Sequence, residues 1–189
     1  MTALPATEIL LIRHAPARTG GRLAGRSDVP ADLPGAAALA ALRAGVGGLD
    51  RLVISPALRC RQTAEAVFPG LPATADARLW EQDFGAWEGA DPASLPDLGP
   101  LSGAALADHR PPGGESFADV CARVAPALAA LPGGRTAIVA HAGVARAALA
   151  LALGSPGLGL AFEVAPLSLT VLRRHPGGWS VACVNRTFG

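Results

Sequence analysis

Ile9-Leu10-Leu11-Ile12-Arg13-His14 is a short apolar run that ends in two basic side chains. Four consecutive apolar residues followed by a turn are typical of a strand that is buried on both faces of a sheet. An Ala-Pro turn then leads the chain into a loop rich in Gly, Arg and Pro. We therefore expect the guanidinium and the imidazole to stand where a buried strand reaches the edge of its sheet.

The same pattern occurs twice more. Residues 52–54 form a second apolar run, and a Ser-Pro turn leads from it into a helix that carries Arg59 near its N-terminus. Residues 137–140 form the third run, which His141 and an apolar helix follow. The carboxyl ends of parallel strands form the ligand-binding edge of an α/β sheet, and helix N-termini there offer N–H groups. The sequence therefore predicts one anion pocket, and phosphate suits it because guanidinium N–H groups match its oxygens.

Composition narrows the function classes. At 189 residues, half of them hydrophobic, the chain is long enough for one domain with a sizeable core. A net charge of +1 and an aromatic content of 4% argue against a nucleic-acid partner. The apolar runs are too short for a signal peptide or a membrane span, so we expect no membrane association. The three widely spaced cysteines favour a reduced, cytoplasmic compartment and show no metal-ligand spacing.

Apolar runs and helical patterns alternate along the chain. We predict one three-layer α/β domain over residues 1–189, with a mostly parallel sheet, helices on both faces and an antiparallel edge. Residues 89–114, rich in Pro and Gly, are expected to form a binding loop with at most a short helix. The expected strands are 8–13, 51–55, a short one within 71–79, 136–140, and a closing hairpin of 164–173 and 179–185. The expected helices are 35–45, 57–67, 116–131 and 143–153.

Five motifs together resemble the histidine phosphatase superfamily, which has the phosphoglycerate mutase-like fold. They occur in the order of that family and extend from Ile9 to His141, so chance agreement is implausible. The motifs are Leu-Ile-Arg-His at 11–14, Ser-Pro-Ala-Leu-Arg-Cys-Arg-Gln-Thr-Ala at 55–64, Leu-Trp-Glu-Gln-Asp-Phe-Gly-Ala-Trp-Glu-Gly at 79–89, Pro-Gly-Gly-Glu-Ser-Phe at 112–117 and His-Ala-Gly at 141–143.

The resemblance implies a histidine acid-type phosphatase, a phosphoric monoester hydrolase, and gives roles to five residues. His14 is the expected nucleophile, which forms a phosphohistidine. Arg13 and Arg59 are expected to clamp the phosphoryl oxygens, and His141 to donate a hydrogen bond to them. Glu81 is the expected general acid for the leaving oxygen. Since arginine and histidine neutralise the phosphate, the resemblance implies no metal and no cofactor.

Two details are similar to the α-ribazole phosphatase branch, which removes phosphate from a nucleotide-loop precursor of cobalamin. One is Ala15, followed by Pro, where the family usually has Gly, and the other is Gly-Arg-Ser-Asp-Val-Pro at 25–30. The expected substrate is a small phosphomonoester, with α-ribazole 5′-phosphate the leading candidate. A phosphoglycerate mutase-type phosphotransferase is an alternative that Gly20, in place of the mutase Asn, disfavours. Because Ala15 replaces the usual Gly, a non-catalytic protein that binds a phosphorylated ligand on the same fold is a further alternative. The oligomeric state stays open.

Other residues of the motifs have competing interpretations. Glu88, seven residues after Glu81, is a rival carboxylate that we expect to bind backbone N–H groups instead. Glu115 fits either an orienting partner of an active-site arginine or a solvated carboxylate at a helix start. Cys60 lies between two arginines, and a small buried core residue is the favoured interpretation over a reactive thiol. Trp80 shields the general acid or packs its segment, and the sequence leaves both open.

Overall fold

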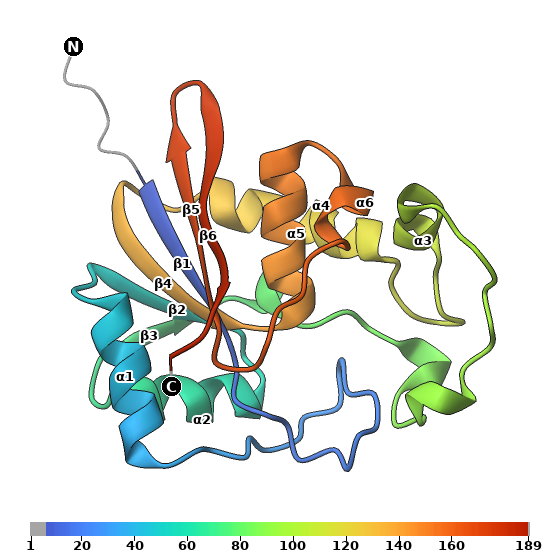
Figure 1. The fold of residues 1–189 in the computed structure, drawn as a ribbon, viewed down its shortest axis with the longest axis horizontal. Coiled ribbons are helices and arrows are strands. Elements are labelled where there is room, and N and C mark those ends of the chain that lie inside the picture. Colours follow the sequence, from blue (N-terminus) through green and yellow to red (C-terminus); the bar gives the residue numbers. More distant parts are fainter. Residues whose placement is uncertain (1–6, 189) are drawn as a thin grey trace.

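The apolar run near the start of the chain forms the centre of a six-stranded sheet. The computed structural model describes residues 7–188, and its sheet has the strand order β3-β2-β4-β1-β5-β6 (Figure 1). Pairs β1–β4, β4–β2 and β2–β3 are parallel, whereas β1–β5 and β5–β6 are antiparallel, which confirms the predicted sheet. The strands are β1 (Thr7–Arg13), β2 (Arg51–Ile54), β3 (Ala73–Ala75), β4 (Gly134–Ala140), β5 (Leu169–His175) and β6 (Gly178–Arg186).

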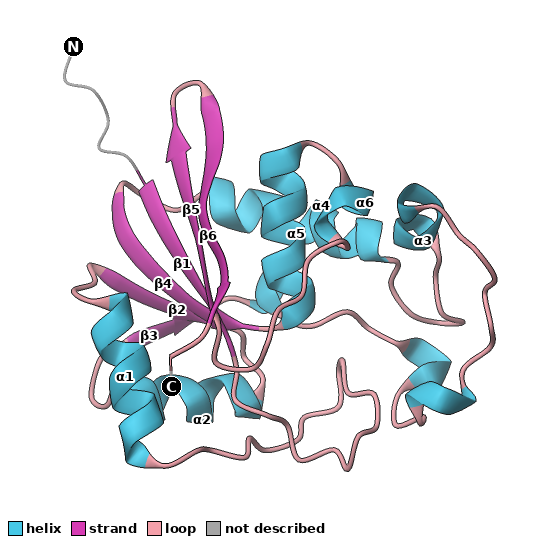
Figure 2. Cartoon of the chain, viewed as in Figure 1, coloured by secondary structure: helices cyan, strands magenta, loops and turns pink. Residues whose placement is uncertain are grey.

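Helices cover both faces of the sheet because alternate residues of β1 point to opposite sides. Ile9 and Leu11 pack into a cluster with α4 (Phe117–Ala129) and α5 (Ala142–Leu153). Leu10 and Ile12 pack into a second cluster with α1 (Ala36–Val46) and α2 (Leu58–Val67). Figure 2 shows the resulting three layers, with α1 and α2 on one side of the strands and α4 and α5 on the other. The single-domain α/β prediction is confirmed for the described residues.

Local signals set where α4 begins. The Ser116 hydroxyl accepts a hydrogen bond from the Asp119 N–H at 3.2 Å, and the Asp119 carboxylate accepts one from the Ser116 N–H at 2.7 Å. This reciprocal pair is a capping box, which satisfies N–H groups that the first helical turn leaves free. In the described part of the chain, no helix is both long enough and apolar enough to cross a bilayer.

Two expectations concern segments outside the main layers. The predicted loop 89–114 contains a 3₁₀ turn, η3 (Pro92–Ser94), and one short helix, α3 (Gly103–Asp108), in agreement with the expectation of a loop with at most a short helix. The strand expected within 71–79 is present but does not reach Glu81, since β3 ends at Ala75 and another 3₁₀ turn, η1 (Ala77–Leu79), intervenes. The remaining short elements are η2 (Gly85–Trp87) and α6 (Pro156–Gly159), the latter packed against α3 and α5.

Candidate active site

The two histidines of the motifs meet at the carboxyl edge of the sheet. The register of β1 and β4 pairs Arg13 with Ala140, so that His14 and His141 follow on neighbouring strands. The His14 N–H donates to the Ala140 carbonyl at 2.9 Å, and the two imidazole rings meet edge to face with centroids 5.0 Å apart. The structure thus brings together the strand ends that the sequence pattern predicted to converge.

His14 is held as a neutral imidazole with one nitrogen free. Its Nδ1 lies 2.6 Å from the Ala15 carbonyl oxygen, and because that oxygen only accepts, Nδ1 must carry the hydrogen. The lone pair is then on Nε2. Burial lowers the pKa of His14 to about 4, with the Ala15 carbonyl opposing the shift and the Arg59 and Arg13 charges adding to it. His14 is therefore neutral near pH 7, which is the form that a nucleophile needs.

His141 is almost completely buried and is fixed by three neighbours. Its Nε2 lies 2.8 Å from the Ser55 hydroxyl and 3.5 Å from the Cys60 sulfur. The Trp80 ring stacks on it at 6.4 Å with an interplanar angle of 9°. Burial, followed by the charge of His14, holds the pKa of His141 well below its usual value. Burial raises the pKa of the Cys60 thiol to about 12, in agreement with a small core residue and not with a reactive thiol.

The two expected phosphate clamps have different partners. One Nη of Arg13 donates to the Val164 carbonyl at 2.6 Å, while its buried Nε has no partner among the described residues. Arg59 is 1% exposed, and its guanidinium donates to the carbonyls of Ala24, Gly25 and Ser27. These three bonds anchor the loop 24–27 and leave two of the five N–H groups for a phosphate. The clamp roles themselves stay predictions.

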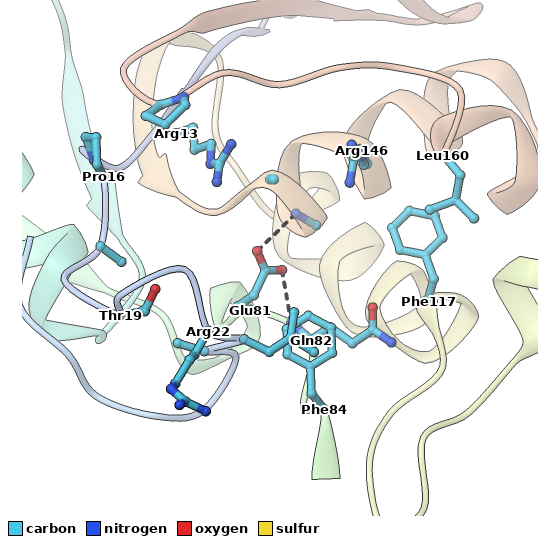
Figure 3. Close-up of a pocket in the computed structure, with 16 residues that line it drawn as sticks. Arg13, Pro16, Thr19, Arg22, Glu81, Gln82, Phe84, Phe117, Arg146 and Leu160 are labelled. Atoms are coloured by element: carbon cyan, nitrogen blue, oxygen red, sulfur yellow. Dashed lines mark hydrogen bonds between the residues drawn. The ribbon is translucent and has the colours of Figure 1, made fainter. Parts of the chain in front are cut away.

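Glu81 lies at the N-terminus of α5, next to His141. Its carboxylate accepts hydrogen bonds from the N–H groups of Gln82 at 3.0 Å and Gly143 at 3.3 Å (Figure 3). A Cβ at position 143 would stand only 2.1 Å from a Glu81 oxygen, so glycine is what allows this approach. The His-Ala-Gly motif therefore supplies both an imidazole and the backbone N–H that holds the carboxylate.

The rival carboxylate Glu88 is enclosed by donors. It accepts bonds from the N–H groups of Gly25, Arg26, Ser27 and Phe84 and from the Ser27 hydroxyl. Burial alone would raise the pKa of Glu88, but these hydrogen bonds, that of Ser27 first, hold it below its ordinary value. Glu88 and Arg59 thus grip the loop 24–27 from two sides, and the expectation that Glu88 binds backbone is confirmed.

A cavity of about 440 Å³ opens beside these residues (Figure 3). Three arginines line it, Arg13, Arg22 and Arg146, and Glu81 is the acidic residue of its wall. Phe84, Phe117, Leu160 and Pro166 give it an apolar side. The cavity does not touch the nearly buried His14, Arg59 and His141, which are 6%, 1% and 1% exposed. Within residues 7–188 no three His, Cys, Asp or Glu side chains gather as metal ligands.

Sequence reasoning missed residues that act on the site through other groups. Thr63 accepts a bond from the Ala15 N–H at 3.0 Å and donates to the Arg59 carbonyl at 2.7 Å, and so ties the loop that follows His14 to α2. The available signal was its position four residues after Arg59, which places both residues on the same face of the predicted helix. Arg146, which lines the cavity directly, was also missed: it lies five residues after His141 and is the one charged residue of the apolar helix α5.

Comparison with known proteins shows that the chain belongs to the histidine phosphatase superfamily, branch 1, whose family model matches residues 9–187. The bifunctional protein Rv2228c of Mycobacterium tuberculosis is 33% identical over 199 residues, which cover 96% of this chain and 54% of that protein. The chain therefore spans about half the length of the curated relatives that it matches.

Solved structures agree with this assignment. The mycobacterial glucosyl-3-phosphoglycerate phosphatase Rv2419c is 26% identical with a TM-score of 0.82, and the alignment covers 96% of this chain and 100% of that one. The α-ribazole phosphatase from Shigella flexneri is 23% identical with a TM-score of 0.79, over 96% and 98% of the two chains, and shows the same fold. The sequence and the fold of this chain are thus those of the histidine phosphatase superfamily.

The depressed pKa of His14 predicts that acid weakens the fold. The unfolded chain binds a proton near pH 6.5, but the folded chain resists it until about pH 4, so stability is lost as the pH falls through this window. We expect the free energy of unfolding, measured with urea, to fall between about pH 7 and about pH 4.5 in the wild type. In His14→Asn this fall should be roughly 2–3 kcal/mol smaller. The exposed His175→Asn is the matched control. Equal acid losses in all three proteins would contradict a buried, neutral His14.

Proposed function

We propose that the chain is a metal-independent phosphomonoesterase that works through a phosphohistidine intermediate. The observation that carries the proposal is the state of His14: a neutral imidazole whose Nδ1–H is tied to the Ala15 carbonyl and whose Nε2 lone pair is free. The charges of Arg13 and Arg59 surround it, and both lower its pKa. A phosphoryl group placed there would meet a nucleophile and two guanidinium ions at once.

The reaction takes place in two displacements. Nε2 of His14 attacks phosphorus while the bond to the leaving oxygen breaks, and Glu81 gives that oxygen a proton. In the second step Glu81, now a carboxylate, takes a proton from water as the water oxygen attacks the phosphohistidine and the N–P bond breaks. Arg13 and Arg59 stabilise the charge on the transferring oxygens in both steps. Inorganic phosphate leaves and His14 returns to its starting form.

His14→Ala should abolish turnover, because no other group of the site has a free nucleophilic lone pair in the same place. Brief incubation of the wild type with a radiolabelled phosphomonoester, followed by quenching, should give a covalent label that is stable to base and labile to acid. The variant should keep its thermal unfolding transition and take up no label. Label that survives in His14→Ala would overturn the nucleophile assignment.

Within this class we propose α-ribazole 5′-phosphate as the substrate, which would give the enzyme a place in cobalamin biosynthesis in the cytoplasm. The support is the sequence likeness at Ala15 and at residues 25–30, a segment whose first part is the loop gripped by Arg59 and Glu88. A mutase-type phosphotransferase is the second candidate, and Gly20 in place of the mutase Asn disfavours it.

A panel of small phosphomonoesters, assayed for released phosphate with EDTA present, tests both the class and the substrate. We expect turnover that EDTA leaves unchanged, because the charge is supplied by arginine and not by a metal ion. The kcat/KM for α-ribazole 5′-phosphate should exceed that of the other esters. Transfer between phosphoglycerate positions would favour the mutase. Binding of phosphate esters without any turnover would favour the non-catalytic alternative raised by Ala15.

Glu81→Gln should slow phosphorylation by alkyl phosphates by roughly 10²–10⁴, the range for a lost general acid. The effect should shrink for p-nitrophenyl phosphate, because its leaving group needs no proton, and phosphoenzyme should then accumulate. Rapid-quench measurement of the phosphorylation step with both esters provides the readout. Glu88→Gln is the matched control, since Glu88 already accepts bonds from four backbone N–H groups. If Glu88→Gln alone showed the leaving-group dependence, Glu88 would be the acid.

A further inference from the structure

Arg123 of α4 uses all five of its N–H groups in one network. Its Nε and one Nη donate to the two carboxylate oxygens of Glu115, each at 2.9 Å. The remaining N–H groups donate to the carbonyls of Arg78 and Trp80 at 2.7 Å and of Glu81 at 2.9 Å. The side chain is only 17% exposed. Because every N–H of the planar guanidinium makes a hydrogen bond, its orientation is fixed. The groups that it binds are fixed relative to one another as well.

The carbonyls that Arg123 holds belong to the segment that carries the candidate general acid. Trp80 and Glu81 lie between the turns η1 and η2 and belong to no helix or strand. Their carbonyl oxygens accept no backbone hydrogen bond from the described residues. Arg123 therefore supplies the hydrogen bonds to these carbonyls that a helix or a sheet would otherwise provide.

Glu115 fixes the other end of the same segment. Its carboxylate accepts the Asp83 N–H at 3.0 Å, and its own N–H donates to the Asp83 carbonyl at 2.8 Å. Its carbonyl accepts the Gln82 side-chain amide at 2.7 Å. Burial would raise the pKa of Glu115, but the bond from Arg123 and the Asp83 N–H hold it below its ordinary value, so the partner of Arg123 stays charged.

We propose that Arg123 is a positioning residue for the general acid. This inference rests on the proposed role of Glu81. By holding the Trp80 and Glu81 carbonyls against α4, Arg123 keeps the Glu81 carboxylate at the α5 N-terminus and the Trp80 ring on His141. Lysine would substitute only in part, because a single ammonium group has three N–H donors and cannot span a carboxylate and three carbonyls.

Loss of Arg123 should slow the phosphorylation step most for esters whose leaving oxygen needs the proton from Glu81. A displacement of about 1 Å in a catalytic group costs roughly 10²-fold in rate. Arg123→Ala should therefore slow phosphorylation by an alkyl phosphate by about 10²-fold, and phosphorylation by p-nitrophenyl phosphate by much less. Arg123→Lys should fall between Arg123→Ala and the wild type, and it provides the measurement if the alanine variant fails to fold.

Arg174→Ala is the matched control for a purely structural loss. Arg174 also donates to three carbonyls, those of Leu128, Ala129 and Leu131, and to the Thr7 hydroxyl, but none of its partners belongs to the site. Its loss should lower Tm without any leaving-group dependence. A merely structural Arg123 would behave in the same way.

The double variant Glu81→Gln/Arg123→Ala decides the question. If Arg123 acts through Glu81, the double variant should phosphorylate no more slowly than Glu81→Gln alone, because the group being positioned is already disabled. Additive losses, or an Arg123→Ala loss equal for both esters, would overturn the inference while the proposed function stands. Absence of leaving-group dependence in Glu81→Gln itself would instead remove the proposed acid, and with it the positioning role.

Discussion

The site depends on the parallel pairing of β1 with β4. The bond from the His14 N–H to the Ala140 carbonyl extends that pairing by one residue past the strand end and sets the two imidazoles side by side. A slip of one residue would turn every side chain of β1 to the opposite face. The apolar residues on both faces prevent it, since Ile9 and Leu10 each fill a different core cluster. Core packing thus fixes the relative position of His14 and His141, the two histidines of the proposed site.

Burial then separates the charges of the site. Both histidines are neutral because burial disfavours an imidazolium ion, whereas guanidinium groups stay charged even when buried. Arg13 and Arg59 therefore supply the positive field while His14 keeps its lone pair. Backbone carbonyls are the hydrogen-bond partners of both guanidinium groups: Val164 for Arg13, and three carbonyls of the loop 24–27 for Arg59. Among the described residues, Glu81 is the carboxylate that shares the cavity wall with Arg13.

Sequence patterns predicted the parts of this arrangement that repeat a rule. Apolar runs ending in Arg13, near Arg59 and at His141 gave the strands, their common edge and the layers. Position 81 could not be placed in the same way, because an irregular segment and a 3₁₀ turn separate it from β3, and no periodicity describes such a path. Arg123 belongs to no sequence motif, because the carbonyl oxygens that it binds lie 42 to 45 positions away in sequence. Tertiary hydrogen bonds to irregular backbone are invisible to periodicity.

Three glutamates surround the site, and their hydrogen-bond donors distinguish them. Glu88 accepts from four backbone N–H groups and a hydroxyl, and Glu115 from Arg123 and a backbone N–H, so protonation of either would sacrifice several bonds. Glu81 accepts only two N–H groups, one of them at 3.3 Å, and lines the cavity. A general acid must alternate between protonated and charged forms, and a carboxylate that its surroundings need as an anion cannot do so. Of the three, Glu81 accepts the fewest hydrogen bonds from the described residues and lines the cavity, whereas Glu115 holds its segment and Glu88 holds the loop 24–27. This difference supports the general-acid role proposed for Glu81.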